Sequence, residues 1–426
     1  MIFSKIYWKA VRVLGNLLGL SWPFVIRGLG RKKQLPGHSP QKRALLYFKT
    51  EPFVMPWKVR AYAHTNLWEI VEMVRILNRY GYAVDVVDRD AKQFVPDNVY
   101  DLFLGLGAGH SGKRFSQFAQ RMPCATKILI AAGPEPRLSN KLVLEQYARF
   151  NHRHGCNVPA MRLTEGIDFE SFSCDTDYFM PIGGQGTFCP ESYGNLGKPV
   201  LNYLPSTSPA IRFLPEWLDT RSRNAFLCFA GDGFICKGVD VVVDAFAAMP
   251  DAEVYICGPS SEPAFFEVLG AKLAQSSNIR YEGFIEIGGS RFEQLMAHCA
   301  YVVFSSSAEG CATSVATALR AGLIPVVTHE TGIDIGQFGI KIGGKKDNLV
   351  EETVRACQQA IQMQDTDYRQ RVWVCLEDSL KYTQSSFTAS FDKAIRTVLG
   401  GRSAQTDMRT AYHPTISPVG TPSHSD

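Results

Sequence analysis

The chain has 426 residues, of which 45% are hydrophobic and 20% are charged. This apolar content excludes disorder over most of the chain, and because no apolar run reaches about 20 residues, a conventional transmembrane helix is excluded as well. The net charge is +4 but uneven, since residues 1–50 hold ten Lys and Arg and no acid, whereas the rest holds 35 basic and 41 acidic residues. At about 150 residues per domain we expect two or three domains, and from the mildly acidic body we expect no nucleic-acid partner.

Residues 1–41 form a basic N-terminal segment, in which residues 2–22 have the pattern of an amphipathic helix. Lys5, Lys9 and Arg12 recur along one stripe, and apolar and aromatic residues occupy most other positions. Such a helix suits the interface of an anionic membrane, which residues 1–33 would contact. Two alternatives remain: a helix packed on the body of the protein, and a signal peptide. The signal peptide is disfavoured because no small-residue cleavage site follows the apolar region.

Eleven cysteines are scattered along the chain, and none belongs to a Cys-x-x-Cys pair. Several lie in apolar runs, such as Cys228 and Cys257, which indicates buried small hydrophobic residues in a reducing compartment. The spacing fits no zinc site. We therefore expect a cytoplasmic protein without a metal, in peripheral contact with the inner membrane face.

Residues 42–210 alternate short apolar runs with helical segments, which predicts a doubly wound parallel sheet. A helix is predicted from Asn66, the expected N-cap with Glu69 three residues on, to Gly81. The predicted strands span residues 44–48, 83–87, 102–106, 127–131, 177–182 and 199–204.

Two features at strand ends of this domain are candidate acceptor-binding elements, because such sheets bind ligands beyond the carboxyl ends of their strands. One is the pair His64 and Asn66 at the start of the predicted helix, where Glu69 permits an acceptor role but capping is favoured. The other is the stretch from Gly107 through Gly109 to Gly112, which formally matches the dinucleotide motif GxGxxG. The match is weak because it follows the third strand and lacks the expected acid about 20 residues on. A tight turn that permits close approach of another segment is the alternative.

Residues 211–398 repeat the alternating pattern, after a linker-like boundary between residues 205 and 222. Strands are predicted over residues 224–230, 253–257, 301–304 and 324–328, and helices over residues 239–248, 263–274, 292–299 and 312–321. Residues 350–398 have the pattern of two helices, and the resemblance described below implies that these helices return to the first domain. The composition of residues 399–426 predicts a disordered tail.

The second domain resembles the donor-binding domain of GT-B glycosyltransferases, in particular the retaining family 4 group. Four elements in order carry the resemblance: the loop from Gly231 to Gly238 with Lys237, the strand end at Gly258, the Ser-rich strand end followed by Glu309, and the loop around Gly332. The resemblance covers about residues 226–339 well, and residues 44–205 only by fold pattern. It implies an α/β protein of two Rossmann-like domains with a cleft between them.

The resemblance also implies a function: transfer of a sugar from a UDP- or GDP-linked donor to a glycan or lipid-linked acceptor, with retention and without a cofactor. Lys237 and Glu309 become the catalytic candidates, because an ammonium beside helix N-terminal amides can stabilise a leaving diphosphate. The implied donor-binding residues are Gly231, Gly233, Gly238, Gly258, Ser305, Ser306, Gly310, Ser314, Thr317, Thr331, Gly332 and Ile333.

Two positions depart from the family pattern. Thr317 stands where the family usually has a glutamate that holds the ribose, and Asp232 stands where it usually has a basic residue. Losing a charged hydrogen bond costs roughly 1.5–3 kcal/mol, which Arg280 or Lys341 could offset. A catalytically impaired GT-B protein that binds a glycan or partner is therefore the alternative, followed by a nicotinamide-dependent oxidoreductase that uses Gly107–Gly112.

Overall fold

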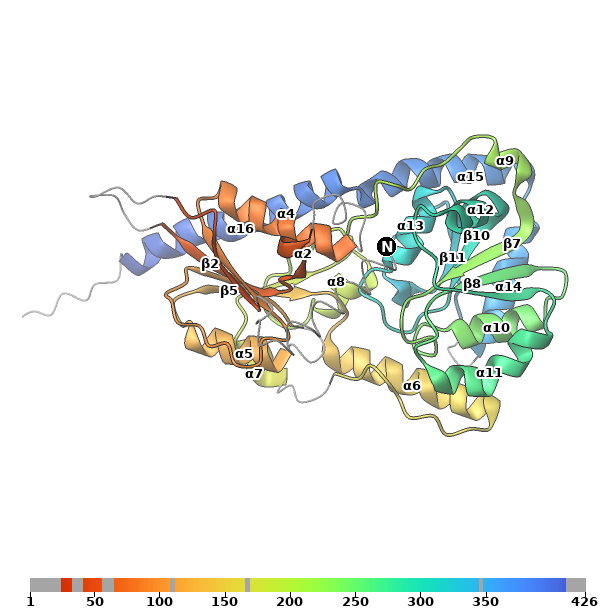
Figure 1. Ribbon diagram of the computed structural model, residues 1–426, viewed down its shortest axis with the longest axis horizontal. Coiled ribbons are helices and arrows are strands. Elements are labelled where there is room, and N and C mark those ends of the chain that lie inside the picture. The colour runs from red at the N-terminus through yellow and green to blue at the C-terminus, as the bar shows by residue number, and fades with distance from the viewer. Residues whose placement is uncertain are drawn as a thin grey trace, which may run out of the picture.

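The computed structural model describes residues 24–32, 41–55, 65–107, 112–164, 169–344 and 348–410. It contains two α/β domains side by side, each built on one sheet of six strands (Figure 1). The predicted helix over residues 2–22 lies outside the described residues. The fold class predicted from the alternation of strands and helices is confirmed.

The first sheet has the strand order β1-β3-β2-β4-β5-β6. The strands are β1 (Val25–Leu29), β2 (Arg43–Phe48), β3 (Ala83–Asp88), β4 (Leu102–Leu106), β5 (Thr126–Ala131) and β6 (Tyr178–Pro181). Strands β2 to β6 are parallel, whereas β1, which the sequence does not predict, pairs antiparallel with β3. The predicted strand over residues 199–204 is wrong: this segment makes only isolated bridges at Val200 and Tyr203.

Helices cover both faces of this sheet. They are α2 (Glu51–Val54), α4 (Thr65–Arg79), α5 (Gly112–Arg121), α6 (Pro136–His154), α7 (Phe169–Cys174) and α8 (Phe188–Ser192). The cover explains why the central strands read as continuous apolar runs without alternation, since a parallel sheet buries both faces. All residues of β3 and β4 are buried.

The second sheet has the order β12-β11-β10-β7-β8-β9, and all its strand pairs are parallel. The strands are β7 (Ser222–Phe229), β8 (Glu253–Cys257), β9 (Ile279–Gly283), β10 (Cys299–Phe304), β11 (Ile324–Val327) and β12 (Ile340–Lys341). The strand order reverses between β7 and β10, and in open α/β sheets ligands bind in the crevice beyond such a point. The helices are α9 (Trp217–Thr220), α10 (Val239–Ala247), α11 (Pro263–Gln275), α12 (Ser290–His298), α13 (Thr313–Arg320) and the short 3-10 helix η2 (His329–Thr331).

From residue 349 to residue 410, the described chain consists of helices: α14 (Leu349–Ile361), α15 (Asp365–Asp378), the 3-10 turn η4 (Ser379–Tyr382) and α16 (Gln384–Thr410). Three α-helices therefore replace the two predicted, and α16 extends past residue 399, where a disordered tail was predicted. Figure 1 shows α16 beside α4 of the first domain. The hydroxyl of Tyr80 donates to Asp392 at 3.1 Å, and the rings of Trp68 and Phe387 meet edge to face.

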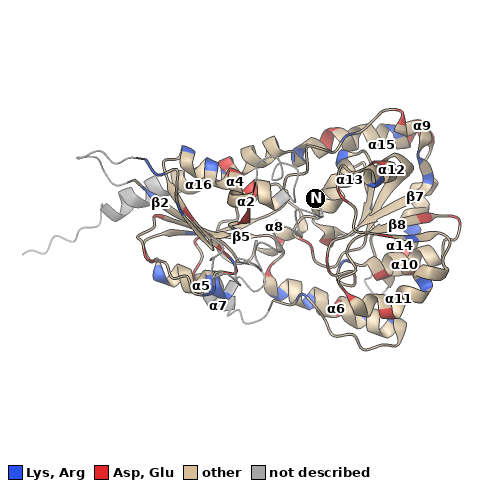
Figure 2. Cartoon of the chain, viewed as in Figure 1, with Lys and Arg blue, Asp and Glu red and all other residues tan. Residues whose placement is uncertain are grey.

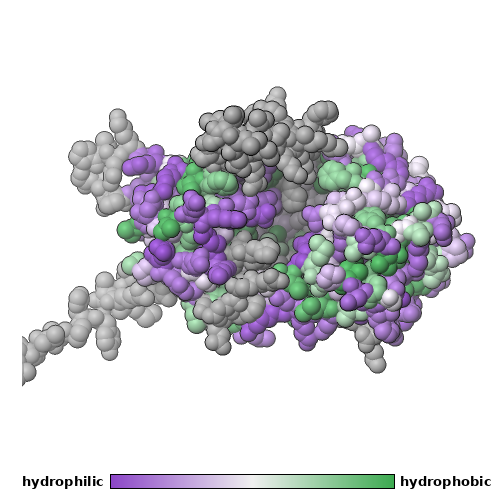
Figure 3. Space-filling model, turned by 60° about the horizontal axis from the view of Figure 1, so that its bottom comes forward, coloured by the Kyte–Doolittle hydropathy of each residue, from purple (hydrophilic) through white to green (hydrophobic). Residues whose placement is uncertain are grey.

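On the face shown in Figure 3, hydrophobic side chains are interspersed with hydrophilic ones over both domains. No helix in the described part of the chain has the length and apolar character needed to cross a bilayer.

Candidate functional site

The loop between β7 and α10 brings Lys237 to the carboxyl end of β10. Gly238 adopts φ +68 at the start of α10, and a Cβ on it would lie 2.1 Å from the carbonyl oxygen of Ser305. Only glycine permits this approach, because both the left-handed backbone and the missing side chain are needed. The hydroxyl and the amide of Ser307 both donate to the carbonyl oxygen of Cys236, at 2.8 and 3.1 Å. The Lys237 loop and the Ser-rich strand end are thereby fixed against each other.

Lys237 and Glu309 form an ion pair at this junction. Their side chains are 10% and 18% exposed, so the pair is partly shielded from water. The Lys237 ammonium also lies 5.9 Å from the ring centroid of Phe304. The structure thus brings both catalytic candidates, 72 residues apart in the chain, to one point.

Gly310 places this point at the contact between the domains. A Cβ on Gly310 would lie 2.3 Å from the carbonyl oxygen of Ala132, directly after β5 of the first domain. A Cβ on Gly332 (φ +71) would in turn lie 2.3 Å from the carbonyl oxygen of Gly310. The backbone amide of Glu309 donates to the carbonyl oxygen of Glu330 at 2.9 Å, and the amide of Ala312 donates to the carbonyl oxygen of Thr331 at 3.1 Å. Three backbone segments from two domains therefore meet beside the Lys237–Glu309 pair.

The hydroxyls expected to bind the donor mostly bond within the protein. Thr317 donates to the Thr313 carbonyl of its own helix at 2.7 Å, and Ser305 lies 3.2 Å from the hydroxyl of Thr353. The Thr331 hydroxyl lies 3.1 Å from that of Thr328. Ser306 Oγ is buried without a hydrogen-bond partner. The hydrogen bonds of Thr317, Ser305 and Thr331 therefore direct their hydroxyls towards other protein groups.

The remaining donor-binding candidates differ in their surroundings. Gly231 is exposed and has open space around it, whereas a Cβ on Gly258 would lie 2.6 Å from the carbonyl oxygen of Ala230. Ser314 is half-buried in the first turn of α13, and Ile333 is buried after η2. Gly231 therefore leaves room where the loop begins, and Gly258 serves close packing.

The candidate acceptor residues are described only in part, because His64 and Gly109 lie outside the described residues. Asn66 is half-buried near the start of α4, which begins at Thr65. Gly107 follows β4, and a Cβ there would lie 2.3 Å from Leu129 Cγ. The predicted capping role of Glu69 is wrong, since its carboxylate accepts hydrogen bonds from the amide (2.7 Å) and hydroxyl (2.9 Å) of Ser206.

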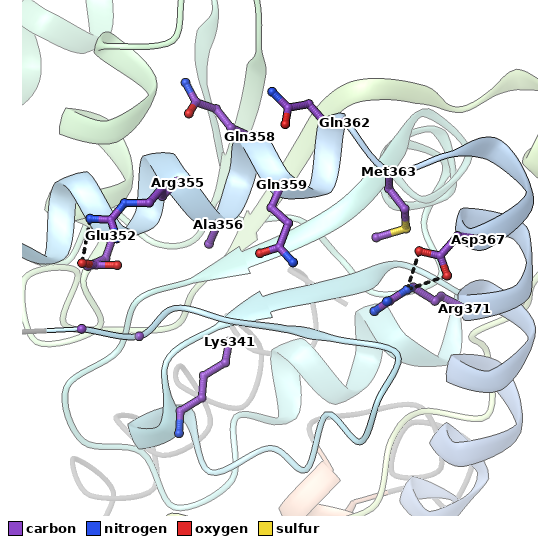
Figure 4. Close-up of a pocket in the computed structure, with 12 residues that line it drawn as sticks. Lys341, Glu352, Arg355, Ala356, Gln358, Gln359, Gln362, Met363, Asp367 and Arg371 are labelled. Carbon is purple, nitrogen blue, oxygen red and sulfur yellow. Dashed lines mark hydrogen bonds and ion pairs between the residues drawn. The ribbon is translucent and has the colours of Figure 1, made fainter.

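Arg280 and Lys341, the two cations expected to compensate for the acidic side chain of Asp232, make their described contacts away from Lys237. Arg280 pairs with Glu253 at 3.4 Å. Lys341 lines a separate pocket beside α14 and α15, which shares no residue with the Lys237–Glu309 pair (Figure 4). The two arginines of that pocket are paired in Figure 4, Arg355 with Glu352 at 2.9 Å and Arg371 with Asp367 at 3.0 Å.

Further functional residues, which no sequence motif indicates, are brought to the Lys237 loop by α6 and the segment after it. Arg162 donates a hydrogen bond to the carbonyl oxygen of Asp232. The hydroxyl of Tyr147 on α6 donates to Glu262 at 2.5 Å, and the other carboxylate oxygen of Glu262 accepts from the Ile235 amide at 3.1 Å. No spacing in the sequence signals these contacts, which join residues 27 to 115 positions apart.

Comparison with known proteins identifies the second domain. Residues 225–362 match the family model for glycosyl transferases group 1. The chain carries a glycosyl transferases group 1 domain. The matched residues include Lys237, Glu309 and the loop around Gly332, and they end one residue after α14. No curated protein matches the chain in a sequence search. Among the described residues, no group of three His, Cys, Asp or Glu is placed to hold a metal ion.

Solved glycosyltransferase structures share the fold around this group 1 domain. Sucrose-phosphate synthase from Thermosynechococcus elongatus has a TM-score of 0.55 at 10% identity, and HepE of Anabaena, in complex with UDP and glucose, has 0.53 at 12%. Each comparison covers 84% of this chain and 100% of the other. The chain therefore has a GT-B fold. It spans only 58% of the pneumococcal O-GlcNAc transferase GtfA, solved with UDP and GlcNAc, at 14% identity, 71% coverage of this chain and a TM-score of 0.48.

Proposed function

We propose that the protein is a glycosyltransferase that moves a hexosyl-type sugar from a nucleotide-sugar donor, UDP- or GDP-linked. The observation that carries this proposal is the Lys237–Glu309 pair at the end of β10, in a group 1 domain and against the first domain. Lys237 immediately precedes Gly238, the N-cap of α10, and the positive end of the helix dipole there also favours an anion. Both groups can stabilise the negative charge that grows on a diphosphate as its bond to the sugar breaks.

For the other half of the reaction, we propose a glycan or lipid-linked acceptor held by the first domain near His64, Asn66, Gly107 and Gly109. Glu309 lies beside the domain contact at Gly310, where it can contact the donor sugar as the acceptor approaches. The family resemblance favours retention of configuration without a metal. The location that we propose is the cytoplasmic face of a membrane, supported by the basic residues of the N-terminal segment.

The alternative is a GT-B protein that binds a glycan or partner without transfer. Two observations favour it: the Thr317 hydroxyl is bonded to its own helix, and the side chain of Asp232 is acidic where a cation is usual. That carboxylate accepts a hydrogen bond from Ser261 at 2.6 Å. Release of UDP or GDP from a panel of nucleotide sugars separates the two functions, because the binding protein releases neither with any donor.

Substitution of the ion pair tests the site itself. We expect Lys237→Ala and Glu309→Ala each to lower the transfer rate at least about tenfold, because each removes a charged contact in the transition state. Lys272→Ala is the matched control, since this lysine also forms an ion pair but on the outer helix α11. Circular dichroism and thermal melting establish that each variant is folded. Wild-type rates in both variants contradict the proposed site.

A further inference from the structure

Arg162 has the strained backbone of a residue held in place by its surroundings. Its φ of +65 is the only positive value for a non-glycine residue in the described ranges. The left-handed conformation is strained for a residue with a side chain, and it persists where neighbouring contacts enforce it. Here the Arg162 guanidinium bonds to the Asp232 carbonyl, and its side chain crosses Gly233, where a Cβ would lie 2.6 Å from Arg162 Cδ. Arg162 nevertheless remains exposed.

The segment that carries Arg162 is fastened to α6 at both ends. Asn151 accepts from the Val158 amide at 2.8 Å and donates to the Val158 carbonyl at 3.0 Å. Asn140 makes the same two bonds with Thr164, at 2.8 and 2.9 Å. Two asparagine side chains thus bind the backbone on either side of Arg162, which defines its position relative to α6.

The second half of α6 is in turn fastened to the second domain. Arg153 forms ion pairs with Asp240 and Asp244 of α10, and Tyr147 bonds to Glu262. Glu262 holds the backbone of the Lys237 loop through Ile235. Although it precedes the domain boundary in sequence, Arg162 is therefore attached to the same loop as Lys237.

The charges around this loop leave a diphosphate with too little positive charge if Lys237 acts alone. The Lys237 ammonium is already paired with Glu309, and Asp232 adds a second negative side chain to the loop. Partial loss of water by itself lowers the pKa of Arg162, but acidic neighbours, among them Glu309 and Asp232, raise it above its usual value. The guanidinium is thus within electrostatic reach of Glu309. It supplies a second cation beside the carbonyl of Asp232, where the family places a basic side chain.

We propose that Arg162 binds the diphosphate of the nucleotide-sugar donor, in place of the basic residue that Asp232 replaces. This inference rests on the proposed glycosyltransferase function and adds a donor-binding residue from the segment after α6. A guanidinium suits the role because its planar donors can hold two phosphate oxygens at once. Its present bond to a neutral carbonyl is one that a phosphate can displace.

Isothermal titration calorimetry of the full chain with UDP, GDP and UMP tests this role. We expect Arg162→Ala to weaken binding of UDP or GDP, whichever the wild type prefers, roughly tenfold, the loss of one charged hydrogen bond. The Kd for UMP rises by a smaller factor, because UMP lacks the second phosphate. Arg162→Lys keeps part of the affinity, and Asp232→Arg in the Arg162→Ala background restores part of it. Arg212→Ala, which removes an exposed arginine paired with Glu293, is the control and leaves Kd unchanged.

The outcomes separate this proposal from the one on which it rests. If the wild type binds neither UDP nor GDP, the proposed function fails and the role of Arg162 fails with it. If the wild type binds and Arg162→Ala binds equally well, only the role of Arg162 is overturned. An equal loss for UMP and the diphosphate also overturns it, because a purely structural effect of Arg162 weakens both nucleotides alike.

Discussion

The two domains can approach each other closely at Gly310 because this residue has no side chain. A methyl group there would lie 2.3 Å from the Ala132 carbonyl oxygen and 2.8 Å from Ile182 Cγ2, so backbone would have to move. We expect Gly310→Ala to lower the free energy of unfolding by about 1–3 kcal/mol and to lower the transfer rate. Gly133→Ala, one residue beyond Ala132, is the control, because no atom lies within 4 Å of its Cβ. Equal denaturant midpoints for the two variants would argue against this contact.

Glu69 makes stability depend on pH near neutrality. Its carboxyl group is buried, and the loss of water raises its pKa from 4.5 to about 7, against the opposing effect of two hydrogen bonds from Ser206. Between these two values the folded state binds more protons than the unfolded state, so the free energy of unfolding falls as pH rises. The total effect of a 2.5-unit difference is on the order of 3 kcal/mol.

Glu69→Gln should remove this dependence, because the amide has no charge to bury. We expect the stability of Glu69→Gln relative to the wild type to increase from pH 5 to pH 8, measured by urea unfolding at each pH. Glu267→Gln, at an exposed position on α11, should show no such trend. A difference between Glu69→Gln and wild type that stays constant with pH would refute the buried, protonated carboxyl group.

At the scale of elements, the sequence predicts what burial and local chemistry determine. The strand β10 is predictable because all of Cys299–Phe304 is buried and apolar, and the start of α10 because only glycine fits at Gly238. The sequence could not show where α6 docks, because the ion pair of Arg153 with Asp240 joins residues that are 87 positions apart. The same limit explains the error at Glu69, whose acceptor role for Ser206 depends on a linker 137 residues on.

The docking of α6 depends on one deeply buried carboxylate. Asp240 is fully buried, and burial raises its pKa to about 6 despite the opposing effect of Arg153. Arg153→Met leaves this charge without its cation and should cost about 3–5 kcal/mol of unfolding free energy. Lys272→Met, which removes the half-buried lysine paired with Asp244, should cost less than about 1 kcal/mol. Chemical denaturation measures both values, and similar losses would show that α6 is not anchored at Asp240.

At the scale of the whole molecule, the two domains are joined by more than the linker. The helix α6 reaches from the first domain to α10 and α11, while α16 returns from the second domain to α4 (Figure 1). Lys237, Glu309 and Gly310 lie between α6 and α16 in the sequence. Such double anchoring favours a site held by fixed contacts, with Arg162 and Lys237 on one loop assembly.

The N-terminal segment differs in charge from this body, where acidic and basic residues are interspersed over both domains (Figure 2). The structure limits which residues of this segment can contact a membrane. Residues 25–29 form β1 of the first sheet, and Arg27 forms an ion pair with Asp97 at 2.8 Å. A deletion that tests membrane contact should therefore remove residues 1–23 and keep β1. Lys5, Lys9 and Arg12 would then be lost, at about 1 kcal/mol of lipid attraction each, together with the apolar face of the predicted helix.

We expect the full chain to sediment with phosphatidylglycerol vesicles. For the chain without residues 1–23, we expect the ratio of protein in the supernatant to protein in the pellet to be at least about tenfold higher. Phosphatidylcholine vesicles should bind both chains weakly, because they offer no net negative charge. If residues 2–22 instead pack on the body, the deletion lowers the melting temperature and leaves sedimentation unchanged, because the lost apolar contacts are internal. If they are a signal peptide, the intact mass of the protein isolated from cells lacks them. Each of these two results contradicts membrane contact through residues 1–23.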